Sequence, residues 1–445
     1  MTLWIKDPLA ILAEDAARGV LVEGPRILAC VPAGAEPDRP VTAVFDASRH
    51  VVIPGLINAH HHFYQTMTRA FPPALNKPLF GWLTTLYPVW ARLTPEALRL
   101  AARLACVELL LSGCTTASNH HYVYPKGLEE ALDIEAEEAG RLGLRAVLAR
   151  GAMSLSAEDG GLPPAAVVQR DEAILADFER VVARHHDGRE GAMLQVALAP
   201  CSPFSVTPEL MRQTARMGEQ LGVRLHTHLA ETRDEDAYCL ARFGMRPLDY
   251  LEEAGWLGPR TWLAHGIHFT DAEIARLGRA GTGVCHCPTS NMIISSGICR
   301  VPELEAAGVA VGLGVDGAAA QDSSNLMQEV RQGFLLRRVA GTPEAVTHLD
   351  ALRWATAGSA ACLGRPELGV IAPGKAADLA LFALDEPRFS GAGDPLAALV
   401  LCGAHRADRV MVNGRWVVEV GAIPGLDLAA LMAEHAAAAR ALQAG

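Results

Sequence analysis

Residues 51–62 read VVIPGLINAHHH, an apolar run that ends in three histidines. A run that is apolar at nearly every position is typical of a parallel strand buried on both faces. Successive side chains of a strand point to opposite faces, so His60 and His62 share one face and His61 points away. Two imidazoles therefore converge at the end of this segment, although a polar strand end with solvent-facing histidines would give the same pattern.

Seven more segments have the same character, and most of them end in polar residues. They are residues 114–121, 145–151, 194–202, 224–231, 261–268, 281–288 and 309–317. Most are followed by a stretch long enough for a helix, and this alternation predicts parallel strands joined by crossover helices. Eight such segments predict an α/β fold, a (β/α)8 TIM-type barrel, in which catalytic groups lie at the carboxyl ends of the strands.

The two ends of the chain carry a different pattern. Residues 27–52 are rich in Val, Pro and Gly, and residues 369–420 alternate short apolar runs with turns such as Asn413-Gly414. Asn-Gly between apolar runs is a strong signal for an antiparallel hairpin. The expected domains are a small β-sandwich-like domain formed from both chain ends, residues 1–54 and 365–445 with a C-terminal helix over residues 426–442, and a barrel over residues 55–364.

The composition indicates a globular enzyme, and the charge pattern predicts a small-molecule partner. The chain has 445 residues, of which 50% are hydrophobic and 20% are charged, a balance that excludes a disordered or fibrous protein. Its formal net charge of −11 comes without a Lys/Arg run, so we expect no nucleic-acid partner. The expected partner is a small-molecule substrate. Barrel enzymes are commonly symmetric assemblies, which favours a homo-oligomer.

The cysteines and the short apolar runs suggest where the protein works. Ten cysteines are scattered without the spacing of a disulfide scaffold, which favours reduced thiols and a cytoplasmic location. Charged residues such as Lys6 and Asp7 interrupt residues 1–19, so we expect no export signal. The apolar run 396–404 is far shorter than the roughly 20 residues that cross a bilayer. We predict a buried strand there and no contact with membranes.

Other predicted strand ends carry histidines and a carboxylate. The fifth segment ends in HTHLAE at residues 226–231, the sixth contains His265, and the eighth ends in Asp316 and Gly317. Because strand ends around a closed barrel face one mouth, these side chains and the histidines of residues 60–62 can meet at one point. Imidazole and carboxylate ligands with one open position are typical of a catalytic Zn²⁺ or Fe²⁺ site.

Together these elements resemble the amidohydrolase superfamily, and the resemblance covers essentially the whole chain. The elements that carry it are residues 54–62, His228-Leu229-Ala230-Glu231, His265 and Asp316. More narrowly, the spacing from His228 to Glu231 and the run HCPTSN at residues 286–291 are similar to the branch that deaminates nucleobases and s-triazines.

By position, the resemblance implies that one divalent metal per chain, zinc or alternatively iron, is bound by His60, His62, His228 and Asp316. It also implies that Glu231 shuttles protons and that His265 and Asp316 hold the attacking water. Relatives with two metals bridge them through a modified lysine at the end of the fourth strand, where this chain has Ala199-Pro200-Cys201-Ser202. One metal is therefore expected, in a hydrolase that removes an exocyclic amino group from a nitrogen heterocycle.

Three longer stretches, at residues 60–70, 149–156 and 394–405, are similar to the 8-oxoguanine deaminases, a group often labelled as hydroxyatrazine ethylaminohydrolases. This resemblance implies conversion of 8-oxoguanine to urate and ammonia. Two alternatives stay open, an isocytosine or guanine deaminase and an s-triazine hydrolase that removes an alkylamine or chloride. A noncatalytic binding protein on the same scaffold would be expected to lack ligands, and none of them is missing from the sequence.

Four residues are candidates for substrate contacts. Gln65 follows His62 by three residues, and its amide offers a donor and an acceptor to a lactam-type ring edge. Trp82, Tyr122 and Arg150 lie after strands or in the loop beyond the first one, where an aromatic wall and a donor to a purine carbonyl would fit. Each of these three could equally be structural. The loop AAAQD at residues 318–322 departs from the wider branch, in which small hydroxyl residues are common at this place.

Overall fold

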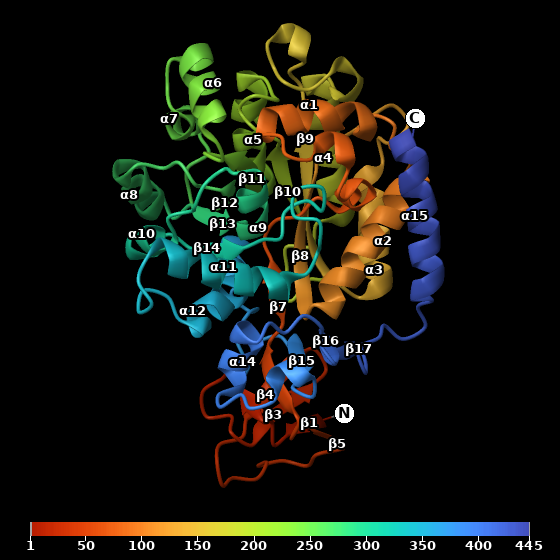
Figure 1. The fold of residues 1–445 in the computed structure, drawn as a ribbon, viewed down its shortest axis with the longest axis vertical. Coiled ribbons are helices and arrows are strands. Elements are labelled where there is room, and N and C mark those ends of the chain that lie inside the picture. Colours follow the sequence, from red (N-terminus) through yellow and green to blue (C-terminus); the bar gives the residue numbers. More distant parts are fainter. Residues whose placement is uncertain (1, 445) are drawn as a thin grey trace.

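The computed structural model describes residues 2–444, and its centre is an eight-stranded parallel sheet (Figure 1). The strands pair in the order in which they occur in the sequence. They are β7 (Leu56–Asn58), β8 (Cys114–His121), β9 (Arg145–Ala152), β10 (Leu194–Pro200), β11 (Arg224–Leu229), β12 (Thr261–His265), β13 (Gly283–His286) and β14 (Val311–Leu313). Each predicted segment contains one of these strands, and the expected TIM-type barrel is confirmed.

The barrel closes where β14 meets β7. Three hydrogen bonds join the two strands and the residues that follow them: from Ala59 N–H to Leu313 O at 2.9 Å, from Asp316 N–H to His60 O at 3.0 Å, and from Val315 N–H to Asn58 Oδ1 at 2.9 Å. The first and last strand ends therefore lie side by side. This closure places His60 next to Asp316.

Helices surround the barrel (Figure 1). They are α1 (Leu79–Trp90), α2 (Pro95–Leu111), α3 (Ala131–Leu142), α4 (Asp171–His185), α5 (Pro208–Leu221), α6 (Arg233–Phe243), α7 (Pro247–Glu253), α8 (Asp271–Ala280), α9 (Pro288–Ile293), α10 (Val301–Ala306), α11 (Leu326–Ala340), α12 (His348–Arg353) and α13 (Ser359–Cys362). Local signals set their ends. Before α5 the Thr207 hydroxyl accepts the N–H of Leu210 at 3.1 Å, and after it Gly222 takes a φ of 67°, as helix caps commonly do.

Two smaller sheets lie at one end of the barrel (Figure 1). One has the order β4-β3-β1-β5 and comes from the N-terminal part of the chain, whereas the other has the order β17-β16-β15-β6-β2 and combines both chain ends. The strands are β1 (Thr2–Lys6), β2 (Ala10–Ile11), β3 (Gly19–Glu23), β4 (Arg26–Cys30), β5 (Ala43–Asp46), β6 (His50–Pro54), β15 (Leu379–Ala383), β16 (Arg409–Val412) and β17 (Arg415–Val418). Whether these sheets form a separate domain with the predicted boundaries stays a prediction.

The opening segment, residues 51–62, contains two strands rather than one. Strand β6 ends at Pro54 in the five-stranded sheet, and β7 begins at Leu56 in the barrel. Gly55 lies between them, and a Cβ there would lie 2.2 Å from the side chain of Thr115. The chain can pass from one sheet to the other at this point because glycine leaves that space free.

Two expectations for the C-terminal part need correction. The run 396–404 forms the helix α14 (Pro395–Leu401) and not a strand, because Asp394 accepts the N–H of Ala397 at 3.0 Å and Pro395 suits the first helical position. The helix α15 (Leu428–Ala444) packs along α2, away from the small sheets with which the sequence groups it (Figure 1). Within residues 2–444, the helices lack the combination of length and apolar character that crossing a membrane requires.

A buried ion pair ties the barrel to the five-stranded sheet. Arg145, at the start of β9, donates from Nε to Asp378 Oδ2 at 2.9 Å and from Nη2 to Oδ1 at 3.1 Å. The two side chains are 0% and 3% exposed. Arg145 also donates to the carbonyl groups of Gly191 and Ala192, so the guanidinium is well satisfied.

We predict that Arg145→Met lowers the free energy of unfolding by about 3–5 kcal/mol, because Asp378 keeps a buried charge without its cation. Urea denaturation measures this change. Arg184→Met is the control, since the Arg184 side chain, paired with Asp133, is 58% exposed and such pairs contribute at most about 1 kcal/mol. Equal effects of the two substitutions would contradict the assigned role of the buried pair.

Candidate metal centre

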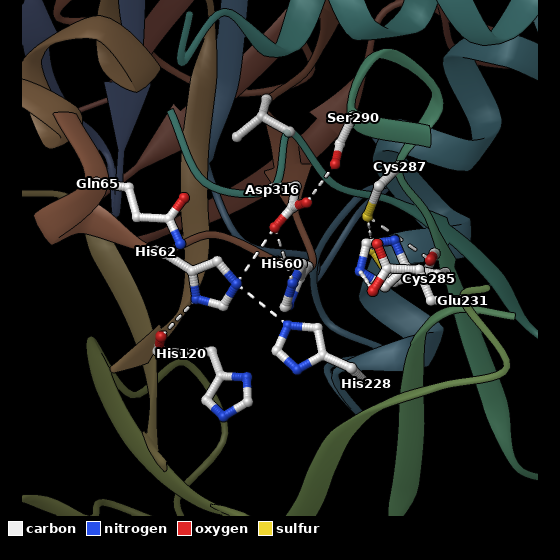
Figure 2. A network of polar contacts seen from close by, with 12 residues as sticks. His60, His62, Gln65, His120, His228, Glu231, Cys285, Cys287, Ser290 and Asp316 are labelled. Atoms are coloured by element: carbon white, nitrogen blue, oxygen red, sulfur yellow. Dashed lines mark hydrogen bonds and ion pairs between the residues drawn. The ribbon is translucent and has the colours of Figure 1, made fainter. Parts of the chain in front are cut away.

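Five side chains from four strand ends meet at the mouth of the barrel, and Figure 2 labels four of them, His60, His62, His228 and Asp316. His60 and His62 follow β7, His228 and His265 lie at the ends of β11 and β12, and Asp316 follows β14. Asp316 Oδ1 lies 3.2 Å from Nε2 of both His60 and His62, and His62 Nε2 lies 3.2 Å from His228 Nε2. One ligand atom each from His60, His228, His265 and Asp316 all lie within 4.8 Å of one another.

Hydrogen bonds at Nδ1 fix the orientation of the His62 and His228 rings. His62 Nδ1 lies 2.6 Å from the carbonyl oxygen of His120, and His228 Nδ1 lies 2.7 Å from that of Cys201. A carbonyl oxygen only accepts hydrogen bonds, so both Nδ1 atoms carry the proton and both Nε2 atoms present a lone pair to the centre. His60 Nε2 is buried there without a hydrogen-bond partner among residues 2–444.

The charges of these groups suit a divalent metal. Burial lowers the pKa of His228 to about 3 and that of His60 well below its usual value, which keeps both rings neutral. Burial alone would raise the pKa of Asp316, but the close contacts of its carboxylate with the His60 and His62 rings, at 3.2 Å, outweigh it and hold this pKa well below the usual value. Neutral imidazoles and an ionised carboxylate are the forms that bind metals. The residues present therefore fit a divalent ion with a position left open.

Two residues of the motif at residues 286–291, Ser290 and Asn291, support the centre from one side. Ser290 donates its hydroxyl to Asp316 Oδ2 at 2.6 Å, and Asn291 Oδ1 lies 3.0 Å from His265 Nδ1. Asp316 and His265 both adopt the left-handed backbone, with φ of 64° and 73°. Residues other than glycine rarely do so, and such strain is concentrated at functional sites.

Glu231 lies beside the centre and faces the pocket (Figure 2). Its Oε2 is 3.5 Å from His265 Nε2. Glu235, on α6, accepts the backbone N–H groups of Ala230 and Glu231 at 3.0 and 2.9 Å, which holds the turn after β11 in place. Burial, and next the negative charge of Asp316, raise the pKa of Glu231 well above its usual value. This carboxyl therefore keeps a proton to a higher pH than a solvated glutamate does.

A pocket of about 370 Å³ opens next to these groups. It includes three of the four predicted substrate contacts, Gln65, Trp82 and Tyr122. The rest of its wall is mostly apolar and includes Leu79, Leu83, Phe204, Ile294 and Ala320. Helix α1, which carries Trp82, lies at the end of the barrel opposite the small sheets (Figure 1).

Gln65 is held at the edge of this pocket with one atom unsatisfied. Its Nε2 lies 3.4 Å from the hydroxyl of Tyr122 and 3.5 Å from that of Tyr64, whereas its buried Oε1 has no partner within residues 2–444. A Cβ at Gly317 would lie 1.8 Å from this oxygen. The amide therefore occupies space that only glycine at position 317 leaves free.

Arg150, the fourth predicted contact, lies outside the pocket. It donates to Asp177 Oδ2 at 2.8 Å and to Gln169 Oε1 at 3.0 Å, and its guanidinium lies 3.8 Å from the ring centre of Tyr124. Its neighbour Ala149 packs inside the barrel, and the alternation of a strand sends Arg150 to the opposite face. That alternation is the signal in the sequence that could have excluded it.

The sequence interpretation gave no role to His120 and His226. Both are fully buried, and their rings lie 5.0 and 4.9 Å, between centroids, from those of His228 and His60. His120 is the last residue but one of the predicted strand 114–121, and His226 lies two residues before His228. The alternation that pairs His60 with His62 could therefore have placed His226 on the same face as His228.

Comparisons with known proteins agree with this geometry. The sequence model of the amidohydrolase family matches residues 51–417. The 8-oxoguanine deaminase of Pseudomonas aeruginosa is 62% identical, over 99% of each chain. The hydroxydechloroatrazine ethylaminohydrolase of a Pseudomonas species is 39% identical, over 91% of this chain and 84% of that protein. The atrazine chlorohydrolase of Arthrobacter aurescens, solved in complex with zinc, superposes with a TM-score of 0.93 at 31% identity, over 98% of this chain and 100% of that one. The chain therefore belongs to the amidohydrolase family.

Proposed function

We propose that this enzyme hydrolyses 8-oxoguanine to urate and ammonia. The observation that carries the proposal is the 62% identity to the Pseudomonas aeruginosa 8-oxoguanine deaminase. It extends over 99% of this chain, so it includes the barrel mouth as well as the scaffold. The resemblance of residues 60–70, 149–156 and 394–405 to the same group points in the same direction.

The pocket suits a flat, polar ring system. Its wall is mostly apolar and carries a few polar groups, Gln65 and Glu231 among them, as is usual for small-molecule sites. We propose that Trp82 and Tyr122 line the faces or edges of the ring, and that Gln65 pairs with a lactam edge. The unpartnered Oε1 of Gln65 would then accept a ring N–H, which relieves the cost of leaving a buried acceptor unsatisfied.

We further propose zinc as the ion, bound by His60, His62, His228 and Asp316, with His265 next to it. When bound, the metal lowers the pKa of water toward neutrality. His265 donates from Nδ1 to Asn291, which leaves its Nε2 as an acceptor that can orient the attacking water. Asp316, ionised by its contacts with the histidines, accepts a second hydrogen bond from that water.

Glu231 moves the protons in this mechanism. It takes a proton from the attacking water and delivers it to a ring nitrogen, which makes the amino-bearing carbon next to it electrophilic. The oxygen of the water bonds to this carbon, and Glu231 passes the remaining proton of that oxygen to the amino group. The carbon–nitrogen bond then breaks and releases ammonia. One water and one 8-oxoguanine give one urate and one ammonia, so atoms and protons balance.

A triazine hydrolase is the second candidate. The 39% identity to the hydroxydechloroatrazine ethylaminohydrolase favours it, and the apolar wall that includes Leu79, Leu83 and Ile294 would accept an N-alkyl group. The same centre would then release an alkylamine in place of ammonia. An isocytosine or guanine deaminase differs only in the ring edges that it recognises, so the same substrate panel tests it.

We also propose that the enzyme is a homo-oligomer that works in the cytoplasm. All ten cysteines are free thiols, as is usual in a reducing compartment. Symmetric assembly is common among soluble enzymes.

The purified protein should contain close to one zinc or iron ion per chain. Removal of the ion with a chelator should abolish deamination, and addition of one equivalent should restore it, because the ligands of the proposed centre lie close enough together to share one ion. Elemental analysis together with activity measures both. Two tightly bound metals per chain, or full activity after chelation, would refute the mononuclear centre.

Glu231→Gln should lower kcat by about two to four orders of magnitude, the usual contribution of a positioned general acid–base. Metal content and melting temperature should stay near those of the wild type. Glu329→Gln is the matched control, since Glu329 is also buried, and burial raises its pKa to about 8, but it does not line the pocket. If Glu231→Gln stays as active as Glu329→Gln, Glu231 has no part in proton transfer.

For 8-oxoguanine we expect a higher kcat/KM than for guanine, isocytosine, adenine, cytosine or hydroxyatrazine. A pocket with buried polar groups rejects analogues that leave these groups unpaired by up to about 10⁴–10⁵-fold. Ultraviolet absorbance and ammonia release across this panel give the ranking. Guanine matching 8-oxoguanine, or turnover of a triazine alone, would overturn the substrate proposal and leave the metal centre intact.

A further inference from the structure

His226 connects one metal ligand to the barrel interior. It lies on β11 two residues before His228 and is fully buried. Its Nε2 is 2.8 Å from Nδ1 of His60, and its Nδ1 is 2.9 Å from the carbonyl oxygen of Trp262. His226 itself belongs neither to the proposed ligand set nor to the proton-transfer groups described above.

The direction of these hydrogen bonds follows from the acceptor at one end. The carbonyl of Trp262 can only accept, so His226 Nδ1 carries a proton. No carboxylate contacts this ring in the part of the chain that the structure describes, and an imidazolium here would be a buried charge without a partner. His226 is therefore neutral, and its Nε2 accepts a hydrogen bond from His60 Nδ1–H. The proton of His60 then lies on Nδ1, and its Nε2 presents a lone pair to the metal.

Trp262 holds His226 in the required position. Their side chains stack with ring centroids 4.3 Å apart and planes inclined by 14°. The two residues pair between β11 and β12. The indole Nε1 of Trp262 donates to the carbonyl of Ala59 at 3.0 Å, so Trp262 contacts both His226 and the residue next to His60.

The three histidine ligands that face Asp316 differ in how their tautomer is set. Backbone carbonyls fix His62 and His228, and no substitution removes a backbone carbonyl. Only His60 depends on a side chain, that of His226. The effect of His226 on the centre is therefore open to mutation.

We propose that His226 is a positioning residue that fixes the metal-binding tautomer of His60. It accepts the Nδ1 proton of His60 and so keeps His60 Nε2 free to bind the ion. The proposal rests on the metal centre that the proposed function uses, and it is independent of which heterocycle is the substrate.

Two substitutions separate this role from simple packing. In His226→Gln the amide oxygen can still accept from His60 and the amide N–H can still donate to Trp262, so Zn²⁺ affinity should stay within a few-fold of the wild type. In His226→Leu a similar volume remains without an acceptor, and Zn²⁺ affinity should fall by about 10–100-fold, the usual effect of losing such a partner. Competition between the protein and a chromogenic zinc chelator measures both affinities without any substrate.

His286→Leu is the matched control, because His286 is also fully buried on a barrel strand and neither of its ring nitrogens has a partner within residues 2–444. Its Zn²⁺ affinity should equal that of the wild type. Unchanged affinity in His226→Leu, or equal losses in the Gln and Leu variants, would overturn the proposal. Melting temperatures of the metal-free variants report any loss of folding.

A measurement on the zinc-loaded wild type gives an answer even if His226→Leu does not fold. Nitrogen-15 histidine labelling with long-range proton–nitrogen correlation identifies the tautomer of each ring. His226 should be neutral with its proton on Nδ1, and His60 should carry its proton on Nδ1. A proton on Nε2 of His226 would refute the arrangement. Failure of the enzyme to deaminate 8-oxoguanine would leave both of these results unaffected.

Discussion

The hydrogen bond from the backbone of Asp316 to the carbonyl of His60 is the contact on which the whole centre depends. It lies where the last barrel strand meets the first, and it brings ligands from opposite ends of the barrel sequence into contact. Asn58 strengthens the same junction through its side chain. His228 and His265 complete the cluster because they lie at the carboxyl ends of β11 and β12, at the same mouth of the barrel. The same contacts therefore close the barrel and bring the residues of the site together.

Burial shifts the pKa values of the histidines and of the carboxyl groups of the centre in opposite directions. It lowers the pKa of His228 and raises that of Glu231, since a poorly solvated site disfavours charge of either sign. Asp316 alone resists this trend, because two imidazoles contact its carboxylate. One negative charge, on Asp316, therefore lies beside imidazoles that burial keeps neutral, and burial favours the protonated form of the Glu231 carboxyl at the pocket edge. Such a distribution suits a cation and a mobile proton at the same time.

The parts of the molecule that the sequence predicts well are those governed by periodicity. Strand alternation and the common mouth of a barrel bring His60, His228 and Asp316 together before any coordinates are known. The same alternation, applied to Ala149, would have turned Arg150 outward. Residues 396–404 show a competing local effect, because the cap at Asp394 and the proline after it favour a helix over a strand. Phe204 and Ile294 reach the pocket from segments between strands and helices, where spacing carries no directional information.

The close approach of Gly317 to Gln65 constrains how this pocket can diverge among relatives. A side chain at position 317 meets the mobile end of the glutamine rather than rigid backbone, so it would displace the amide and leave the barrel intact. With Gln65 in its proposed role as a substrate contact, the effect would fall on recognition and not on folding. Positions 65 and 317 are therefore epistatic. A substitution at residue 65 can adapt the pocket to a new ring edge while Gly317 stays. A substitution at residue 317 alone displaces Gln65 and removes the existing contact without providing another.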